Sequence, residues 1–261
     1  MKIGVVGLGL IGGSIFKDLV SETDIEVVAV SKSQSGQNIH GYNNIYGSYE
    51  VLKDCEIVFV CTHMNNTVKI LEDLEKFLSP ETIVTDVCSL KEFVSKKTYN
   101  YCFIPSHPMA GTEKKGFENS LEGLFRGASW VLTPLHGTSD EKINKLTEII
   151  VKLGATPIFS TPKAHDEAAA MISHMPMLIA QALFLAAEDS ELAIKMASSG
   201  FRDMTRLALS NEEMANDMIY MNHENIQIAI LKLYKAVGDL TSGNYLEKIK
   251  KIKEHRSKMF H

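Results

Sequence analysis

The stretch K-I-G-V-V-G-L-G-L-I-G-G-S, residues 2–14, determines how the fold of this chain begins. Its apolar start predicts a buried strand, and the residues that follow predict a helix. In such a strand–turn–helix unit, Gly7 permits a tight turn, Gly9 lets the backbone approach a pyrophosphate, and Gly12 lets the helix pack closely. The free N–H groups at the helix start favour phosphate binding. A turn that merely requires glycine is the alternative, but three glycines at this spacing disfavour it. We therefore predict dinucleotide contacts from Gly7, Gly9, Leu10, Ile11 and Gly12.

The next 150 residues alternate apolar, β-branched runs with helical patterns. Strands are predicted at 2–6, 26–31, 56–61, 82–87, 101–105, 129–134 and 156–160, and helices at 11–20, 66–78, 89–97 and 140–154. The strand runs are almost continuously apolar, which is typical of strands covered on both faces. This alternation predicts an α/β, Rossmann-type, doubly wound parallel sheet. Residues 32–50 are rich in Gly, Ser and Asn, so we expect no full helix there.

The composition changes after residues 160–167, and only helical patterns follow. They cover 163–190, where Pro176 predicts a kink, and then 191–209, 211–240 and 245–259. We therefore expect two domains, a dinucleotide-binding domain at 1–160 and an all-α substrate-binding and dimerisation domain at 161–261. The segment 211–240 is apolar over much of its circumference, which favours burial in a helical homodimer. The last helix carries six Lys or Arg between 248 and 258; a solvated outer face is favoured over a membrane-binding surface.

Composition excludes several classes of function. The 261 residues carry a net charge of -5, which disfavours a general nucleic-acid binder. No apolar run approaches the roughly 18 residues of a membrane span, and residues 1–13 fit a strand and turn better than a signal peptide. The four cysteines have no C-x-x-C spacing, which indicates reduced thiols and a cytoplasmic protein. We expect a small-molecule substrate and no metal, nucleic-acid or membrane partner.

The end of the second strand bears on the choice of cofactor. An NAD site usually has Asp or Glu there for the ribose hydroxyls. This chain has V-S-K-S at 30–33, which would hold a 2′-phosphate where a carboxylate would repel it. We therefore favour NADP over NAD, although a solvated loop would explain the same residues. The remaining predicted cofactor contacts are Ser31, Lys32, Ser33 and Thr62.

A histidine follows the strand predicted at 101–105. Doubly wound folds bind ligands beyond the carboxyl ends of their strands, and S-H-P at 106–108 would lie there. Pro108 disfavours helical backbone at His107 and keeps it extended. An imidazole is suited to accept a proton near neutral pH, so we interpret His107 as a general base. A structural histidine is the alternative.

Five motifs in order resemble one enzyme family. They are G-L-G-L-I-G-G-S at 7–14, T-D-V-C-S-L-K at 85–91, H-P-M-A-G-T-E-K-K-G at 107–116, H-D-E-A-A-A-M-I-S-H-M-P at 165–176 and G-F-R-D-M-T-R-L-A at 200–208. From residue 3 to about 225 the chain is similar to the prephenate and arogenate dehydrogenases of tyrosine biosynthesis. The resemblance implies an NAD(P)-dependent oxidoreductase that oxidatively decarboxylates a cyclohexadienyl acid. Hydride leaves the ring carbon that bears the hydroxyl, carbon dioxide is lost opposite, and the ring becomes aromatic.

The resemblance also implies roles for individual residues. His107 accepts a hydrogen bond from the substrate hydroxyl and helps remove its proton, and Ser89 assists at the same hydroxyl. Arg206 pairs with a substrate carboxylate, a role that suits a non-titrating guanidinium. The remaining implied substrate contacts are Thr112, Glu113, Ser173 and His174. A surface salt bridge for Arg206 and a structural role for His174 are the alternatives.

The chain departs from the family pattern at several positions. Met177 replaces a histidine, and the other departures are His63, Ser199, Arg202 and Ala215, which stands where tryptophan is frequent. These changes affect the expected selectivity between the keto acid of prephenate and the amino acid of arogenate. We therefore predict a prephenate dehydrogenase with arogenate dehydrogenase as the nearest alternative. A β-hydroxyacid dehydrogenase or imine reductase is more distant, since we find no comparable lysine. A non-catalytic dinucleotide sensor would not need His107.

Overall fold

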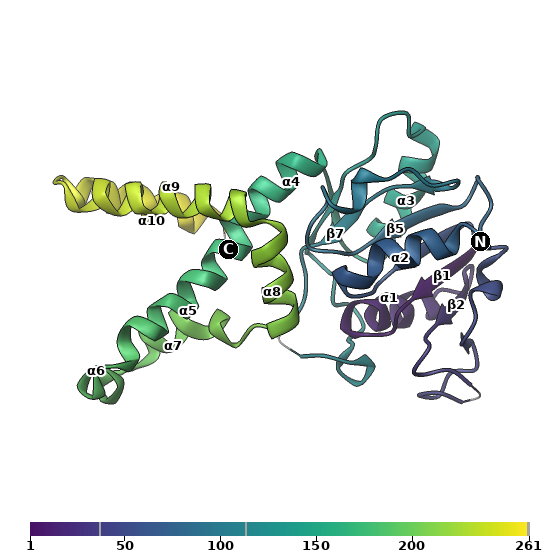
Figure 1. Ribbon diagram of the computed structural model, residues 1–261, viewed down its shortest axis with the longest axis horizontal. Coiled ribbons are helices and arrows are strands. Elements are labelled where there is room, and N and C mark those ends of the chain that lie inside the picture. Colours follow the sequence, from purple (N-terminus) through teal and green to yellow (C-terminus); the bar gives the residue numbers. More distant parts are fainter. Residues whose placement is uncertain (37, 113, 260–261) are drawn as a thin grey trace.

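The predicted first strand lies in the middle of the larger sheet. β1 (Lys2–Val6) pairs in parallel with β2 (Glu26–Val30) on one side and with β4 (Ile57–Val60) on the other. β3 (Ile45–Tyr46), β5 (Ile83–Asp86) and β6 (Cys102–Phe103) complete the all-parallel order β3-β2-β1-β4-β5-β6. This computed structural model describes residues 1–36, 38–112 and 114–259, and Figure 1 shows the sheet region at one end and long helices at the other.

Alternate side chains of the central strands enter two apolar cores. Ile3 and Val5 pack in one core with residues of α1 (Leu10–Val20) and α3 (Asp140–Lys152). Val58 and Val60 pack in the other with residues of α2 (Met64–Leu74). Because both faces of the sheet are covered, the strands read as continuous apolar runs. The predicted doubly wound sheet is confirmed. As expected, the described residues between β2 and β3 contain no α-helix.

Two glycines of the first turn are required by the backbone. Gly7 has φ of +91°, and a Cβ there would lie 2.5 Å from the carbonyl oxygen of Cys61. A Cβ on Gly12 would lie 2.0 Å from the carbonyl oxygen of Gly7. No side chain fits at these distances, so both residues allow α1 to start directly against the ends of β1 and β4.

A second, smaller sheet contains His107. β7 (Ser106–Pro108) pairs antiparallel with β8 (Ser129–Leu132), which pairs in parallel with β9 (Thr156–Phe159). The predicted strand at 101–105 is therefore shorter than expected, since only Cys102–Phe103 joins the first sheet. The chain then passes Pro105, whose carbonyl accepts a hydrogen bond from Thr133, and enters β7. His107 consequently lies within a strand rather than beyond one.

The predicted helix at 89–97 is wrong. Only the short 3₁₀ turn Val94–Lys96 forms there. The N–H groups of Lys91 and Glu92 donate to the carboxylate of Asp166, at 2.8 and 2.9 Å. The segment is therefore a loop that the carboxylate of Asp166 anchors near its start.

The chain after residue 160 is helical, as predicted. α4 (Pro162–Ala169) continues through the π turn Ala170–His174 into α5 (Met175–Glu188). Pro176 lies just after this π turn and cannot donate to the carbonyl four residues earlier; the kink predicted there stays a prediction. The remaining helices are α6 (Glu191–Met196), α7 (Ser199–Thr205), the 3₁₀ turn Arg206–Leu209, α8 (Glu212–Met221), α9 (His223–Thr241) and α10 (Tyr245–Met259).

The helices extend away from the sheet region in two arms. In Figure 1, α5, α6 and α7 form one arm, and α9 and α10 form the other, with α8 beside the sheet region. Among the described residues, one helical stretch, Pro162–Glu188, has the length and the apolar composition that a membrane span needs. This is weak evidence, because helices of soluble proteins pass the same test. The stretch also carries buried His165, Asp166 and His174.

Candidate active site

The glycine turn leaves one position open toward solvent. A Cβ on Gly9 would have nothing within 4 Å, in contrast to those on Gly7 and Gly12. The packing of the protein therefore does not explain a glycine at position 9. Gly9 is the N-cap of α1, no side chain caps this helix start, and its first turn has no acidic residue. An approaching anion would find free N–H groups and a positive helix end there.

The neighbouring strand ends supply hydroxyls and one cation. Ser31 is buried, and its Oγ accepts a hydrogen bond from the backbone N–H of Gln34. Lys32 and Ser33 are exposed, and the ammonium of Lys32 lies 5.5 Å from the ring centre of Tyr49. Thr62 follows β4, with its hydroxyl 3.1 Å from that of Thr67. No carboxylate stands at Val30–Ser33, so this edge suits an anionic group.

A buried ion pair holds β7 against the end of β5. The ammonium of Lys91 bonds to the carboxylate of Asp86, and both side chains are fully buried. Lys91 also donates to the carbonyl of Ser106 at 2.5 Å. The Ser106 hydroxyl is 2.8 Å from that of Thr85 and accepts from the indole N–H of Trp130 at 2.9 Å. These contacts fix the backbone beside His107.

His107 contacts a second histidine from the helical part of the chain. Its Nδ1 is 3.0 Å from Nε2 of His165, and Nδ1 of His165 is 2.7 Å from Oδ1 of Asp166. All three side chains are buried. Burial lowers the pKa of His107 well below its usual 6.5, and the nearby His165, Lys91 and His174 lower it further. The imidazole is therefore neutral at physiological pH and has a free proton-accepting nitrogen.

His174 forms a second buried contact in the helical part. The amide nitrogen of Asn222 donates to the backbone carbonyl of Asp166 at 2.9 Å and lies 3.1 Å from Nδ1 of His174. An amide nitrogen can only donate, so Nδ1 accepts and the proton of neutral His174 is on Nε2. Nε2 is buried and has no partner among the described residues. A buried donor without a partner is costly, so it indicates an acceptor supplied by a ligand or by water.

The structure unites the predicted site residues only in part. His107 and His174 lie in the buried region just described. Ser89 is half-buried in the loop between Asp86 and Lys91, and Arg206 is exposed on the turn after α7. No hydrogen bond or ion pair between described residues joins either of them to His107. Of the other substrate contacts, Ser173 is half-buried, Thr112 is exposed and Glu113 lies outside the described residues.

Sequence reasoning missed His165 and Asp166, although both belong to the motif at 165–176. The available signal was an adjacent histidine and aspartate near the start of an otherwise apolar helical stretch.

Two departures from the family pattern lie close together in the structure. Met177 and Ala215 are both buried in one apolar cluster, with Met64, Cys88, Leu90 and Met218. Apolar packing therefore occupies the position where the family has a histidine.

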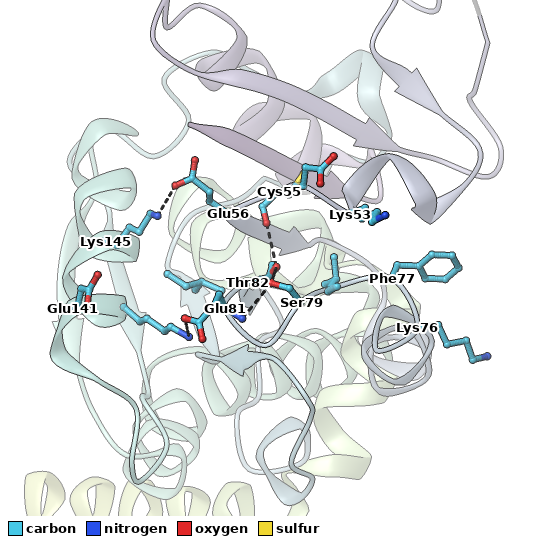
Figure 2. A pocket seen from close by; sticks show the side chains of 14 residues that line it. Lys53, Cys55, Glu56, Lys76, Phe77, Ser79, Glu81, Thr82, Glu141 and Lys145 are labelled. Carbon is cyan, nitrogen blue, oxygen red and sulfur yellow. Dashed lines mark hydrogen bonds and ion pairs between the residues drawn. The ribbon is translucent and has the colours of Figure 1, made fainter.

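An open pocket of about 680 Å³ lies elsewhere, at the amino ends of β4 and β5. Figure 2 shows its lysines and glutamates, and two of its lysines form ion pairs with glutamates that line the same pocket. These pairs are Lys142–Glu81 at 3.1 Å and Lys145–Glu56 at 2.5 Å. Parallel sheets bind ligands at the carboxyl ends of their strands, and this pocket is at the opposite edge. It is therefore not the candidate active site.

Comparisons with known proteins agree with this architecture. A family described as prephenate dehydrogenase, nucleotide-binding domain, matches residues 14–159, and one described as prephenate dehydrogenase, dimerization domain, matches residues 161–252. The chain is 30% identical over 250 residues to a prephenate dehydrogenase of Bacillus subtilis. That match covers 85% of this chain, and the chain spans only 64% of the relative's length.

Two solved structures resemble the whole chain. An arogenate dehydrogenase of Synechocystis is 31% identical, with a TM-score of 0.80 and coverage of 99% of this chain and 96% of that one. A prephenate dehydrogenase of A. aeolicus, solved in complex with hydroxyphenyl propionate and NAD+, is 26% identical, with a TM-score of 0.84. The match covers 99% of this chain and 98% of that one.

The buried state of His174 predicts a pH dependence of stability. Burial lowers its pKa from 6.5 to about 4, so the unfolded chain binds a proton between these values and the folded chain does not. The unfolding free energy should therefore fall as the pH decreases from 6.5 toward 4, by at most about 1.4 kcal/mol per pH unit for this group. His174→Gln should reduce that slope. Urea unfolding at pH 7.5, 6.5, 5.5 and 4.5 measures it.

The matched control is His136→Gln, because His136 is exposed. Its unfolding free energy should follow that of the wild type at each pH. Parallel curves for the wild type and His174→Gln would show that His174 makes no such contribution.

Proposed function

The chain belongs to the prephenate dehydrogenase family, and we propose that it oxidatively decarboxylates prephenate to 4-hydroxyphenylpyruvate with hydride transfer to NAD(P)+. The observation that carries this proposal is the buried, neutral imidazole of His107 on β7, beside the carboxyl end of β5. A sensor that only binds a dinucleotide has no need of a proton acceptor there. Arogenate, which carries an amino acid in place of the keto acid, is the second candidate substrate.

The mechanism we propose centres on the substrate hydroxyl. As hydride departs, the carbinol carbon becomes carbonyl-like and its O–H becomes more acidic, so a base at this oxygen acts mainly in the transition state. Neutral His107 takes this proton, and Ser89 assists by a hydrogen bond to the same oxygen. Burial keeps the imidazole neutral before the proton is transferred. Bound NAD(P)+ supplies the hydride acceptor.

The negative charge of the substrate requires partners as well. We propose that the guanidinium of Arg206, which is exposed and has no ion pair among the described residues, grips one carboxylate. Nε2–H of His174 is a buried donor without a partner and suits a second substrate oxygen. We keep Ser173, Thr112 and Glu113 as further proposed contacts. Loss of carbon dioxide needs no base, because it is driven by aromatisation of the ring.

The cofactor is proposed to lie across the glycine turn, with its pyrophosphate at the start of α1. Gly7, Leu10, Ile11 and Gly12 would form this cradle with Gly9, and Thr62 would line it from the end of β4. Ser31, Lys32 and Ser33 offer two hydroxyls and a positive charge where an NAD-specific site usually has a carboxylate. We therefore favour NADP as the cofactor, with NAD as the alternative.

We also propose a homodimer formed by the helical part, and we keep 1–160 and 161–261 as the two domains. Large apolar side chains are exposed along both helical arms, including Leu185 at 62%, Leu192 at 67%, Met196 at 72% and Leu231 at 68%. Many large exposed apolar side chains on the same few helices are typical of an interface. The match to a dimerization domain supports a second copy of this chain as the partner.

A turnover assay tests the function directly. Purified protein is assayed with prephenate and with arogenate, each with NADP+ and with NAD+. We expect the highest kcat/KM for prephenate with NADP+. A strong preference for NAD+ would reverse the cofactor assignment, and turnover of arogenate alone would reverse the substrate assignment. Absence of turnover with all four combinations would reject the function.

Substitution of His107 tests the proposed base. His107→Ala should lower kcat by at least about 100-fold, the scale on which a general base contributes, while the Kd of the cofactor stays unchanged. Single-turnover kinetics and cofactor titration by fluorescence measure these two quantities. His136→Ala is the control, since His136 is exposed. Undiminished turnover of His107→Ala would remove His107 from the mechanism.

Substitution of Gly9 tests the proposed cradle. Because a Cβ at position 9 meets open space, Gly9→Ala should keep the melting temperature within about 2 °C and raise the cofactor Kd by at least about tenfold. Gly12→Ala should instead lower the melting temperature strongly, because its Cβ would overlap the carbonyl of Gly7. Thermal unfolding and cofactor titration separate the two effects. An unchanged Kd in Gly9→Ala would place the pyrophosphate elsewhere.

A further inference from the structure

We propose that His165 and Asp166 are positioning residues that fix His107 in the tautomer with its proton on Nδ1, so that Nε2 is the nitrogen that accepts the substrate proton. The inference deepens the proposed function and rests on it for its catalytic consequence. The tautomer itself is a property of the free protein and is tested without substrate. The assignment follows from four hydrogen bonds that connect the backbone of Lys91 and Glu92, through Asp166 and His165, to His107.

The first hydrogen bonds orient the carboxylate of Asp166. Its Oδ1 accepts from the backbone N–H of Lys91 at 2.8 Å, and its Oδ2 accepts from that of Glu92 at 2.9 Å. A backbone N–H can only donate, so both oxygens serve as acceptors. Oδ1 also lies 2.7 Å from Nδ1 of His165. Nδ1 of His165 is therefore the donor in this contact and carries a proton.

The proton position on His165 then determines that on His107. In its neutral form, a His165 ring that is protonated on Nδ1 has a bare Nε2, which is an acceptor. It lies 3.0 Å from Nδ1 of His107, which must donate. The opposite tautomer of His107 would place two lone pairs against each other at this distance. His165 and Asp166 are 4% and 3% exposed, so water cannot relieve such a mismatch.

We call the hydrogen-bonded series Asp166–His165–His107 the relay. It leaves Nε2 of His107 as the proton acceptor of the site. No described residue forms a hydrogen bond with this nitrogen. When the substrate O–H bond breaks, its proton bonds to Nε2 and the ring becomes an imidazolium. Nδ1–H of that cation already points at His165, whose own Nδ1–H points at the Asp166 carboxylate. The relay thus places a buried negative charge two hydrogen bonds from the new positive charge and orients the ring before the substrate binds. The orienting carboxylate of a serine-protease triad acts in the same way.

Nitrogen-15 NMR of the ring nitrogens tests the tautomer in the free, full-length protein at pH 7.5. The signals of His107 are assigned by their loss in His107→Gln. We expect a protonated Nδ1 and a bare Nε2 for His107 in the wild type, while exposed His136 should show exchange between both tautomers. A wild-type His107 with its proton on Nε2 overturns the proposal, whatever the enzyme catalyses.

Two substitutions of His165 test the catalytic consequence. His165→Gln can still offer a carbonyl oxygen to Nδ1–H of His107, whereas His165→Leu offers no acceptor. We expect His165→Leu to lower kcat about 100-fold with KM for the substrate within about threefold, and His165→Gln to recover at least about tenfold of that loss. The NMR signals of His107 should show the opposite tautomer in His165→Leu and the original one in His165→Gln.

The outcomes separate this inference from the proposed function. Equal losses in both variants, with the His107 tautomer unchanged in both, would show a merely structural role and overturn the relay. Full activity of His165→Leu would overturn it as well. If no substrate is turned over by the wild type but His107 has its proton on Nδ1, the proposed function fails and the relay stands as a property of the fold.

Discussion

The carboxylate of Asp166 is the contact on which the arrangement of the site depends. It lies on α4, at the start of the helical part, and accepts the N–H groups of Lys91 and Glu92 from the loop after β5. A carboxylate that accepts two backbone N–H groups has little freedom to turn. The same group accepts from His165, which contacts His107. One side chain therefore joins the two parts of the chain and sets the position of the proposed base.

A second buried charge works together with the first. Lys91 places its backbone N–H on Asp166 and its ammonium on Asp86 and Ser106. Removing one partner of a buried ion pair is strongly destabilising, typically by about 3–5 kcal/mol. Lys91, Asp86 and Asp166 thus hold the end of β5, the loop after it and β7 together, and substitution of Lys91 or Asp86 leaves the other buried charge without its partner. The neighbours of buried His107 are therefore fixed by ion pairs and hydrogen bonds as well as by packing, which gives the imidazole a defined orientation.

Much of the sheet was predictable because its signals are local. The apolar run at 2–6, the glycines of the first turn and the helix predicted at 11–20 each depend on local sequence, and the structure confirms them. The helix predicted at 89–97 is absent, and the segment is instead a loop whose Lys91 N–H binds the carboxylate of Asp166, 75 residues away. The pairing of His107 with His165 spans 58 residues and leaves no periodic pattern in the sequence. Long-range hydrogen bonds of this kind are visible only in the folded chain, and the predicted roles of Ser89 and Arg206 stay predictions.

A crystal structure with the oxidised cofactor and an unreactive substrate analogue tests the central claim most directly. The account predicts Nε2 of His107 within about 2.6–3.2 Å of the analogue's hydroxyl oxygen, with Nδ1 still on His165. A ring turned so that Nε2 faces away, with the hydroxyl farther than a bridging water could span, would contradict it.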